Sequence, residues 1–224
     1  MVWTSQRIDF KIDEFMRLIV QKGYVVTWEK ASDCPCMPKD SQGQPDFNCP
    51  LCKGKGRYYY DPKTIQGIMS NFSDELKYDE TGKIMSGLSY FTTLPQYKLG
   101  FWDRLTNKHS KIRNSEIVVK GEHGAKDRLR FEPVKILNLR TISRVYDKNI
   151  DFMFDEKSSS IDWVPTGKEP VRGERYTVEY ELHPRWICID LVNVLRDTYV
   201  KSKKAGVAFQ ELPVRALVRL EIWL

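Results

Sequence analysis

Four of the five cysteines of this chain lie close together, between residues 34 and 52 of a sequence of 224 residues. They form two pairs, Cys34-x-Cys36 and Cys49-x-x-Cys52, separated by twelve residues. Two thiolates a few residues apart converge on one cation if the chain turns tightly between or after them. Gly54 and Gly56, just beyond the second pair, are small enough to let backbone N–H groups approach the sulfurs. The cluster therefore predicts a metal-tied loop.

Zinc held by Cys34, Cys36, Cys49 and Cys52 is the metal that this spacing favours. A site with four protein ligands has no open position, so zinc there would staple the fold rather than activate water. Oxidation of the pairs to disulfides and an iron–sulfur centre are the alternatives. The fifth cysteine, Cys188, lies between two isoleucines and is interpreted as a small buried apolar residue.

The rest of the chain has the pattern of a mainly β protein. Runs with a period of two, such as Tyr176–Leu182 and Val214–Leu224, are typical of half-buried antiparallel strands. Short strands with frequent turns predict a β-barrel or sandwich. Residues 187–200 fit either a strand or a helix, and their β-branched content favours a strand first, followed by a short helix after Asn193.

An N-terminal helix is predicted from apolar residues at three- and four-residue spacing, with Gly23 as its stop. This apolar stripe is interpreted as core packing and consists of Ile8, Ile12, Phe15, Met16, Ile19 and Val20. Strands at 24–29 and 57–60 would flank the cysteine loop as a hairpin stem. The expected organisation is a helix and strand at 1–30, a zinc-binding insertion at 31–60 and a mainly β body at 61–224.

Composition and motifs exclude several functions. No apolar stretch approaches the roughly 18 residues of a membrane helix, and the N-terminus has no signal-peptide pattern, so no membrane partner is expected. No phosphate-binding loop, nucleophile elbow or dinucleotide fingerprint is present. The histidines, His109, His123 and His183, stand in no ligand motif. We therefore expect no enzymatic activity and no catalytic residues.

The charge is mildly basic, with 36 Lys and Arg against 30 Asp and Glu and a pI near 9.0. The excess concentrates near the C-terminus. This excess of basic residues has two interpretations: a solvated loop without a binding role, or a surface that faces DNA or an acidic partner. The candidate residues for that surface are Lys201, Lys203, Lys204 and Arg215.

Two resemblances extend this reading. Residues 49–56, Cys-Pro-Leu-Cys-Lys-Gly-Lys-Gly, resemble one repeat of the zinc-binding region of DnaJ-type chaperones, but the fourfold repetition and the J-domain motif of those proteins are missing. Residues 87–224 resemble structural proteins of tailed bacteriophages from the neck, or head–tail connector. The phrases that carry the second resemblance are Gly100-Phe-Trp-Asp-Arg-Leu105, Asp127-Arg-Leu-Arg-Phe-Glu-Pro-Val134, Tyr146-Asp-Lys-Asn-Ile-Asp-Phe152, Ile161-Asp-Trp163, Pro170, Gly173, Tyr176-Thr-Val-Glu-Tyr180, His183-Pro-Arg-Trp186 and Leu195-Arg-Asp197.

The phage resemblance implies a virion structural protein, assembled in the host cytoplasm, that forms a homo-oligomeric ring around the DNA channel and joins head to tail. It implies contacts with copies of itself, with portal or adaptor and tail proteins, and with packaged DNA. Rings require two different patches on each subunit that meet head to tail. The alternatives are a tail or baseplate structural protein and a nucleic-acid-binding zinc-ribbon protein, which would bind DNA or RNA in a salt-dependent manner as a monomer.

Overall fold

The computed structural model describes residues 12–37, 44–46, 49–71, 87–122, 125–156, 158–191, 197–202 and 206–223; for 71, 197–202 and 206–210 it describes the main chain only. The chain divides into two compact units, each considered by itself. Unit 1 comprises residues 1–107 and 185–224, and unit 2 comprises residues 108–184. The sequence patterns predicted one body at 61–224. They gave no sign of a second unit, because unit 2 lies between the paired strands that end at residue 106 and begin at residue 185, and no linker-like composition marks its ends.

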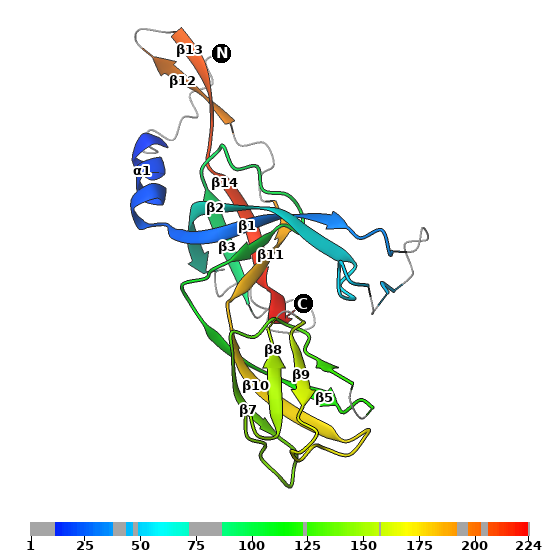
Figure 1. Cartoon of the computed structure of the whole chain (residues 1–224). Helices are drawn as coiled ribbons and strands as arrows, with labels where there is room; N and C mark the ends of the chain where they lie inside the picture. Colours follow the sequence, from blue (N-terminus) through cyan, green and yellow to red (C-terminus); the bar gives the residue numbers. More distant parts are fainter. Residues whose placement is uncertain are drawn as a thin grey trace, which may run out of the picture. The chain divides into compact units, whose positions relative to one another are not determined.

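Unit 1 contains the helix α1 (Ile12–Lys22) and most of the longer strands (Figure 1). Its strands are β1 (Tyr24–Asp33), β2 (Arg57–Asn71), β3 (Leu88–Thr93), β4 (Arg104–Thr106), β11 (Arg185–Asp190), β12 (Asp197–Ser202), β13 (Gly206–Glu211) and β14 (Val214–Leu220), followed by a short 3₁₀ turn, η2 (Glu221–Trp223). Six of them pair in the closed order β1-β2-β3-β14-β11-β4, while β12 and β13 form a separate hairpin. The expectation of a mainly β body with an N-terminal helix is confirmed.

The barrel of unit 1 closes where β4 pairs with both β1 and β11. The buried carboxylate of Asp103, next to β4, accepts hydrogen bonds from the Trp28 indole at 2.7 Å and from the Ala31 amide at 3.1 Å, both on β1. The Asp103 carbonyl accepts a further hydrogen bond from the Cys188 amide on β11. Around this point lies an apolar core, which includes Cys188 as expected and consists of Val26, Trp28, Ile65, Phe91, Leu99, Leu105, Cys188, Ala216 and Val218.

The helix α1 ends at Lys22, as the stop at Gly23 predicted. A Cβ at Gly23 would lie 2.3 Å from the Ile19 carbonyl oxygen, which accepts a hydrogen bond from the Gly23 amide. Within the expected apolar stripe, Ile19 is fully buried, whereas Val20 is 49% exposed and does not belong to the packed face. Ile8 lies outside the described residues. No described helix is long and apolar enough to cross a membrane.

Unit 2 consists of two small sheets. The first has the order β5-β10-β7 and contains β5 (Ile112–Val119), β10 (Arg175–Leu182) and β7 (Lys135–Arg140). The second has the order β6-β9-β8 and contains β6 (Asp127–Arg128), β9 (Ser160–Trp163) and β8 (Phe152–Asp155). Buried Asp127 joins the two sheets, because its carboxylate accepts hydrogen bonds from the Trp163 indole at 2.8 Å and the Tyr176 hydroxyl at 2.9 Å.

The ambiguous segment 187–200 begins in strand β11, so the preference for a strand first is confirmed. The short helix expected after Asn193 falls partly on 192–196, which lie outside the described residues, and is wrong from Asp197 onward, where the chain forms β12. The C-terminal alternation predicted a strand through Leu224, but β14 ends at Leu220 and the chain turns into η2.

We predict that Gly67→Ala destabilises unit 1. A Cβ at Gly67 would lie 2.2 Å from the Phe91 ring, and Phe91 is fully buried in the barrel core. Such overpacking costs about 1–3 kcal/mol, measured by urea denaturation. Gly100→Ala is the control, since its nearest neighbours lie at an ordinary 3.4 Å, and we expect its effect to stay within about 1 kcal/mol. Equal effects of the two substitutions would contradict this packing.

Candidate metal centre

The cysteine loop connects β1 to β2, which pair as the predicted hairpin stem. Cys34 and Cys36 follow β1 directly, and Cys49 and Cys52 lie in the turn before β2. A hydrogen bond of 2.9 Å from the Cys34 amide to the Gly56 carbonyl closes the base of the loop. The stem therefore fixes one cysteine pair opposite the other.

Backbone hydrogen bonds and positive φ angles shape the turn that holds Cys49 and Cys52. The amides of Lys53 and Lys55 donate to the carbonyls of Cys49 and Cys52 at 2.9 and 3.1 Å. Lys53, Gly54 and Gly56 all have positive φ, a conformation that glycine adopts without strain. At Gly56 a Cβ would also lie 2.9 Å from the Met37 sulfur. The two glycines thus permit the tight turn after the second pair, whereas the N–H groups that approach the sulfurs of Cys34 and Cys49 belong to Cys36, Leu51 and Cys52.

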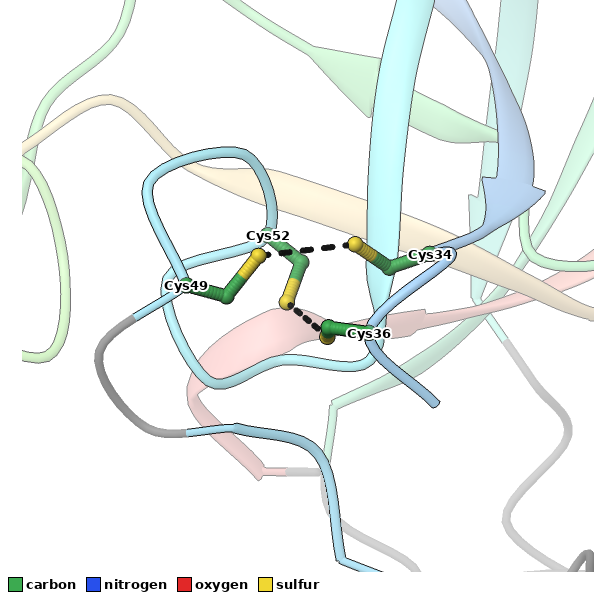
Figure 2. Close-up of side chains that lie close together, drawn as sticks. All are labelled: Cys34, Cys36, Cys49 and Cys52. Atoms are coloured by element: carbon green, nitrogen blue, oxygen red, sulfur yellow. Dashed lines mark hydrogen bonds between the residues drawn. The ribbon is translucent and has the colours of Figure 1, made fainter. Parts of the chain in front are cut away.

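The four Sγ atoms lie within 4.8 Å of one another, and the four side chains point toward a common centre (Figure 2). Cys34 and Cys49 have their sulfurs 3.6 Å apart, and Cys36 and Cys52 theirs 3.4 Å apart. A tetrahedron with metal–sulfur bonds of about 2.3 Å has sulfur–sulfur edges of about 3.8 Å. The cluster therefore has the dimensions for one metal ion, and the prediction that these four residues come together is confirmed.

Local contacts set the thiol acidities differently. The backbone N–H groups of Cys52 and Leu51 point at the Cys49 sulfur and lower the pKa of its thiol to about 7. Burial raises the pKa of Cys36 to about 12. The pKa of Cys34 is lowered by the Cys36 amide, but burial and the thiols of Cys49 and Cys52 outweigh that contact and raise it overall. At neutral pH Cys49 is therefore partly ionised to the thiolate, whereas Cys34 and Cys36 stay protonated until a metal ion binds.

Two basic residues attach the loop to the barrel. The Lys55 ammonium lies 2.8 Å from the Glu221 carboxylate in η2. Arg57 stacks on the Trp102 ring, with its guanidinium carbon 3.9 Å from the ring centroid. Trp102 has a φ of 68°, strained for so large a side chain. These contacts could not be predicted from the sequence, because no local signal links Lys55 to a residue 166 positions away.

The other candidate residues do not gather into a described site. Lys201 lies in β12 opposite Val207, while Lys203 and Lys204 lie outside the described residues. Arg215, on β14, stacks over Tyr90 with its guanidinium carbon 3.7 Å from the ring centroid. The DNA-facing role of these four residues stays a prediction. Of the histidines, His183 contacts the Ser110 carbonyl, and His123 is outside the described residues.

A model of a domain of unknown function (DUF4815) matches residues 102–201, which are 100 of the 224 residues. The match covers all of unit 2 and stops well short of the cysteine loop. No curated protein matches the chain. The chain is thus similar to this family over less than half of its length, and the metal centre lies outside the similar region.

We predict that replacing Cys49 and Cys52 together by serine abolishes metal retention. Two of four thiolates cannot hold a tightly bound thiophilic ion. The apolar cluster of the loop consists of the four cysteines and the partly buried Tyr58, so it can replace little of the lost stabilisation. Loss of a ligand that contributes about 4 kcal/mol would lower the melting temperature by about 10 °C. Metal analysis and calorimetry measure both. Cys188→Ala, in the barrel core, should keep its metal; metal retention by the double variant would contradict the assignment.

We also predict that metal binding at about pH 7.5 releases at least two protons per ion, because Cys34 and Cys36 have raised pKa values and bind metal only as thiolates. Affinity should consequently rise with pH and fall as pH is lowered. Titration calorimetry in buffers of different ionisation enthalpy counts the protons. Binding without proton release would show that the cluster is already deprotonated, or that other ligands hold the ion.

Proposed function

We propose that this protein is a structural subunit of a tailed-phage neck, which assembles into a ring around the DNA channel and has no enzymatic activity. The observation that carries the proposal is the surface of unit 2, where apolar side chains face solvent. Eight large apolar side chains of this unit are exposed: Ile117, Val119, Val134, Ile142, Val145, Ile150, Met153 and Val171. So much exposed apolar surface on a small unit is typical of a protein that contacts other proteins.

The metal in this proposal is zinc with a structural role. Four cysteine sulfurs at tetrahedral spacing form a closed ligand set, and zinc is the usual occupant of such sites in proteins. Bound zinc would hold the loop's conformation and present Lys55 and Arg57 to the barrel. Mononuclear iron uses the same ligand set, and its visible absorption would distinguish it from colourless zinc.

The phage setting is supported by the resemblance of residues 87–224 to neck proteins and by the places of its phrases in the fold. Gly100–Leu105 forms the turn at which the barrel closes, and its Gly100 amide donates to the Asp103 carboxylate at 2.7 Å. Asp127 and Tyr176, from two later phrases, form the hydrogen bond between the sheets of unit 2, and Trp163 from a third phrase also donates to Asp127. The resembling phrases thus coincide with the interactions that hold each unit together. Portal or adaptor proteins, tail proteins and packaged DNA are the partners in this proposal, and the virion is its location.

We expect the purified metal-bound protein to form rings, visible by negative-stain electron microscopy and as one large species in analytical ultracentrifugation. Mass spectrometry of purified virions should detect the chain. A monomer that binds DNA with steep salt dependence would instead favour the nucleic-acid-binding alternative. A metal-bound protein that stays monomeric at high concentration and is missing from virions would refute the proposal. Presence in tails stripped of heads would move it to the tail or baseplate.

A further inference from the structure

Strand β5 of unit 2 has one edge without a partner strand. Its other edge pairs with β10 over the whole strand without a bulge. Where this ladder continues past β5, the Lys120 amide donates to the Glu174 carbonyl at 2.9 Å. Because bonded and non-bonded pairs alternate in an antiparallel ladder, the even-numbered residues of β5 bond to β10. The odd-numbered residues therefore turn their N–H and C=O groups to the open edge; they are Arg113, Ser115, Ile117 and Val119.

The edge of β5 lacks the proline and the bulge that commonly protect an edge strand. Its odd-numbered residues are all exposed, and Ile117 and Val119 are 69% and 56% exposed. Among the described residues, no main-chain hydrogen bond to this edge is recorded. By contrast, the edge of β2 that β3 leaves unpaired before Gly67 is interrupted by Pro62 and by the positive φ of Asp61. The edge of β5 is thus regular and open to a further strand.

The hairpin β12–β13 of unit 1 is a ribbon of two strands with an open edge on either side. Among the described strands, β12 and β13 pair only with each other. The hairpin lies in the connection from β11 to β14, two strands that pair directly in the barrel. A two-stranded hairpin by itself is only marginally stable in water. The ribbon therefore gains stability when a further strand pairs with one of its edges.

The strand of this hairpin that suits β5 is β13. Residues 206–210 of β13, Gly-Val-Ala-Phe-Gln, carry no charge, and the following Glu211 forms an ion pair with Lys98. β12 contains Lys201, and β5 contains Arg113 with Lys111 just before it. Like charges on adjacent strands oppose pairing. Charge therefore favours β13 over β12 as the partner of β5.

We propose that β13 of one copy pairs through main-chain hydrogen bonds with the open edge of β5 in the next copy. Strand addition of this kind draws its affinity from backbone groups, and both edges have such groups to offer. The two surfaces differ, so the contact is head to tail and closes into a ring when its rotation does. This inference rests on the proposed ring assembly and names the surfaces that form it.

The test blocks each side of the contact separately. Ser115→Pro removes an amide from the open edge of β5 and leaves the ladder with β10 intact, because Ser115 is an odd-numbered residue. Val207→Pro with Phe209→Pro prevents β13 from pairing as a strand. We expect each variant to lose rings, with association weakened about tenfold or more.

The matched controls keep every amide. They are Ser115→Ala for the edge, and Val207→Thr with Phe209→Tyr for the hairpin, and both should assemble like the wild type. Circular dichroism and calorimetry establish that each variant folds. Ile117→Pro, at the next odd-numbered position, repeats the edge test if Ser115→Pro does not fold.

Mixing the two proline variants gives the most specific result. The Ser115→Pro chain keeps its hairpin, and the Val207→Pro, Phe209→Pro chain keeps the open edge of β5. One contact can then form between the two chains, and neither can extend it into a ring. We therefore expect sedimentation velocity to show a one-to-one heterodimer in the mixture and monomers in each variant alone.

The outcomes separate this inference from the ring proposal. Wild-type rings that persist in both proline variants would overturn this inference and leave the ring proposal standing. Loss of rings in the hairpin variant alone would show that hairpins pair with each other, which overturns it. Loss in both variants without a heterodimer on mixing would show that the hairpin does not bind β5 of another copy, which also overturns it. A wild type that forms no ring defeats both proposals.

Discussion

The carboxylate of Asp103 holds the barrel of unit 1 together at its point of closure. It accepts hydrogen bonds from the Trp28 indole and the Ala31 amide on β1, and the backbone carbonyl of Asp103 accepts one from the Cys188 amide on β11. The closing strand β4 has only three residues, so its pairings alone offer few hydrogen bonds. Unit 2 repeats the device, since Asp127 accepts from the Trp163 indole and the Tyr176 hydroxyl. A buried carboxylate is stable only when such donors surround it.

The position of the cysteine loop depends on that closed barrel and not only on the four cysteines. Its stem is the end of the β1–β2 hairpin where Asp33 pairs with Arg57. Lys55 forms an ion pair with Glu221 in η2, and Arg57 stacks on Trp102, the residue before Asp103. Besides the adjoining stem, these contacts join the loop to two parts of unit 1 that are distant in sequence, Glu221 and Trp102. A metal ion would therefore add order to a loop whose position the barrel already sets, which suits a structural role better than an independent zinc-finger module.

The sequence predicted the features that depend on residues close together along the chain: strands, the end of a helix and the cysteine cluster. Alternation predicted β10 and β14, Gly23 predicted the end of α1, and cysteine spacing predicted the cluster of four sulfurs that could hold a metal ion. The patterns did not predict that residues 108–184 form a unit of their own, because paired strands β4 and β11 flank it instead of a linker. Nor did they predict the exposed side of α1, since Val20 fits the apolar stripe by spacing and its 49% exposure follows from where the helix meets β2. Contacts such as Lys55–Glu221 arise from tertiary folding and leave no trace in spacing.

The position of β14 has a consequence for how the chain is made. This strand lies between β3 and β11, so the barrel cannot close until residues 214–220 have left the ribosome. At a synthesis rate of about 5–20 residues per second, β1 to β3 wait several seconds beside an open edge while unit 2 is translated. Unit 2 has its full set of strands by residue 182 and is free to fold during that interval. The nascent chain thus completes its inserted part first, and its N-terminal barrel closes only when β14, which is made after unit 2, has emerged.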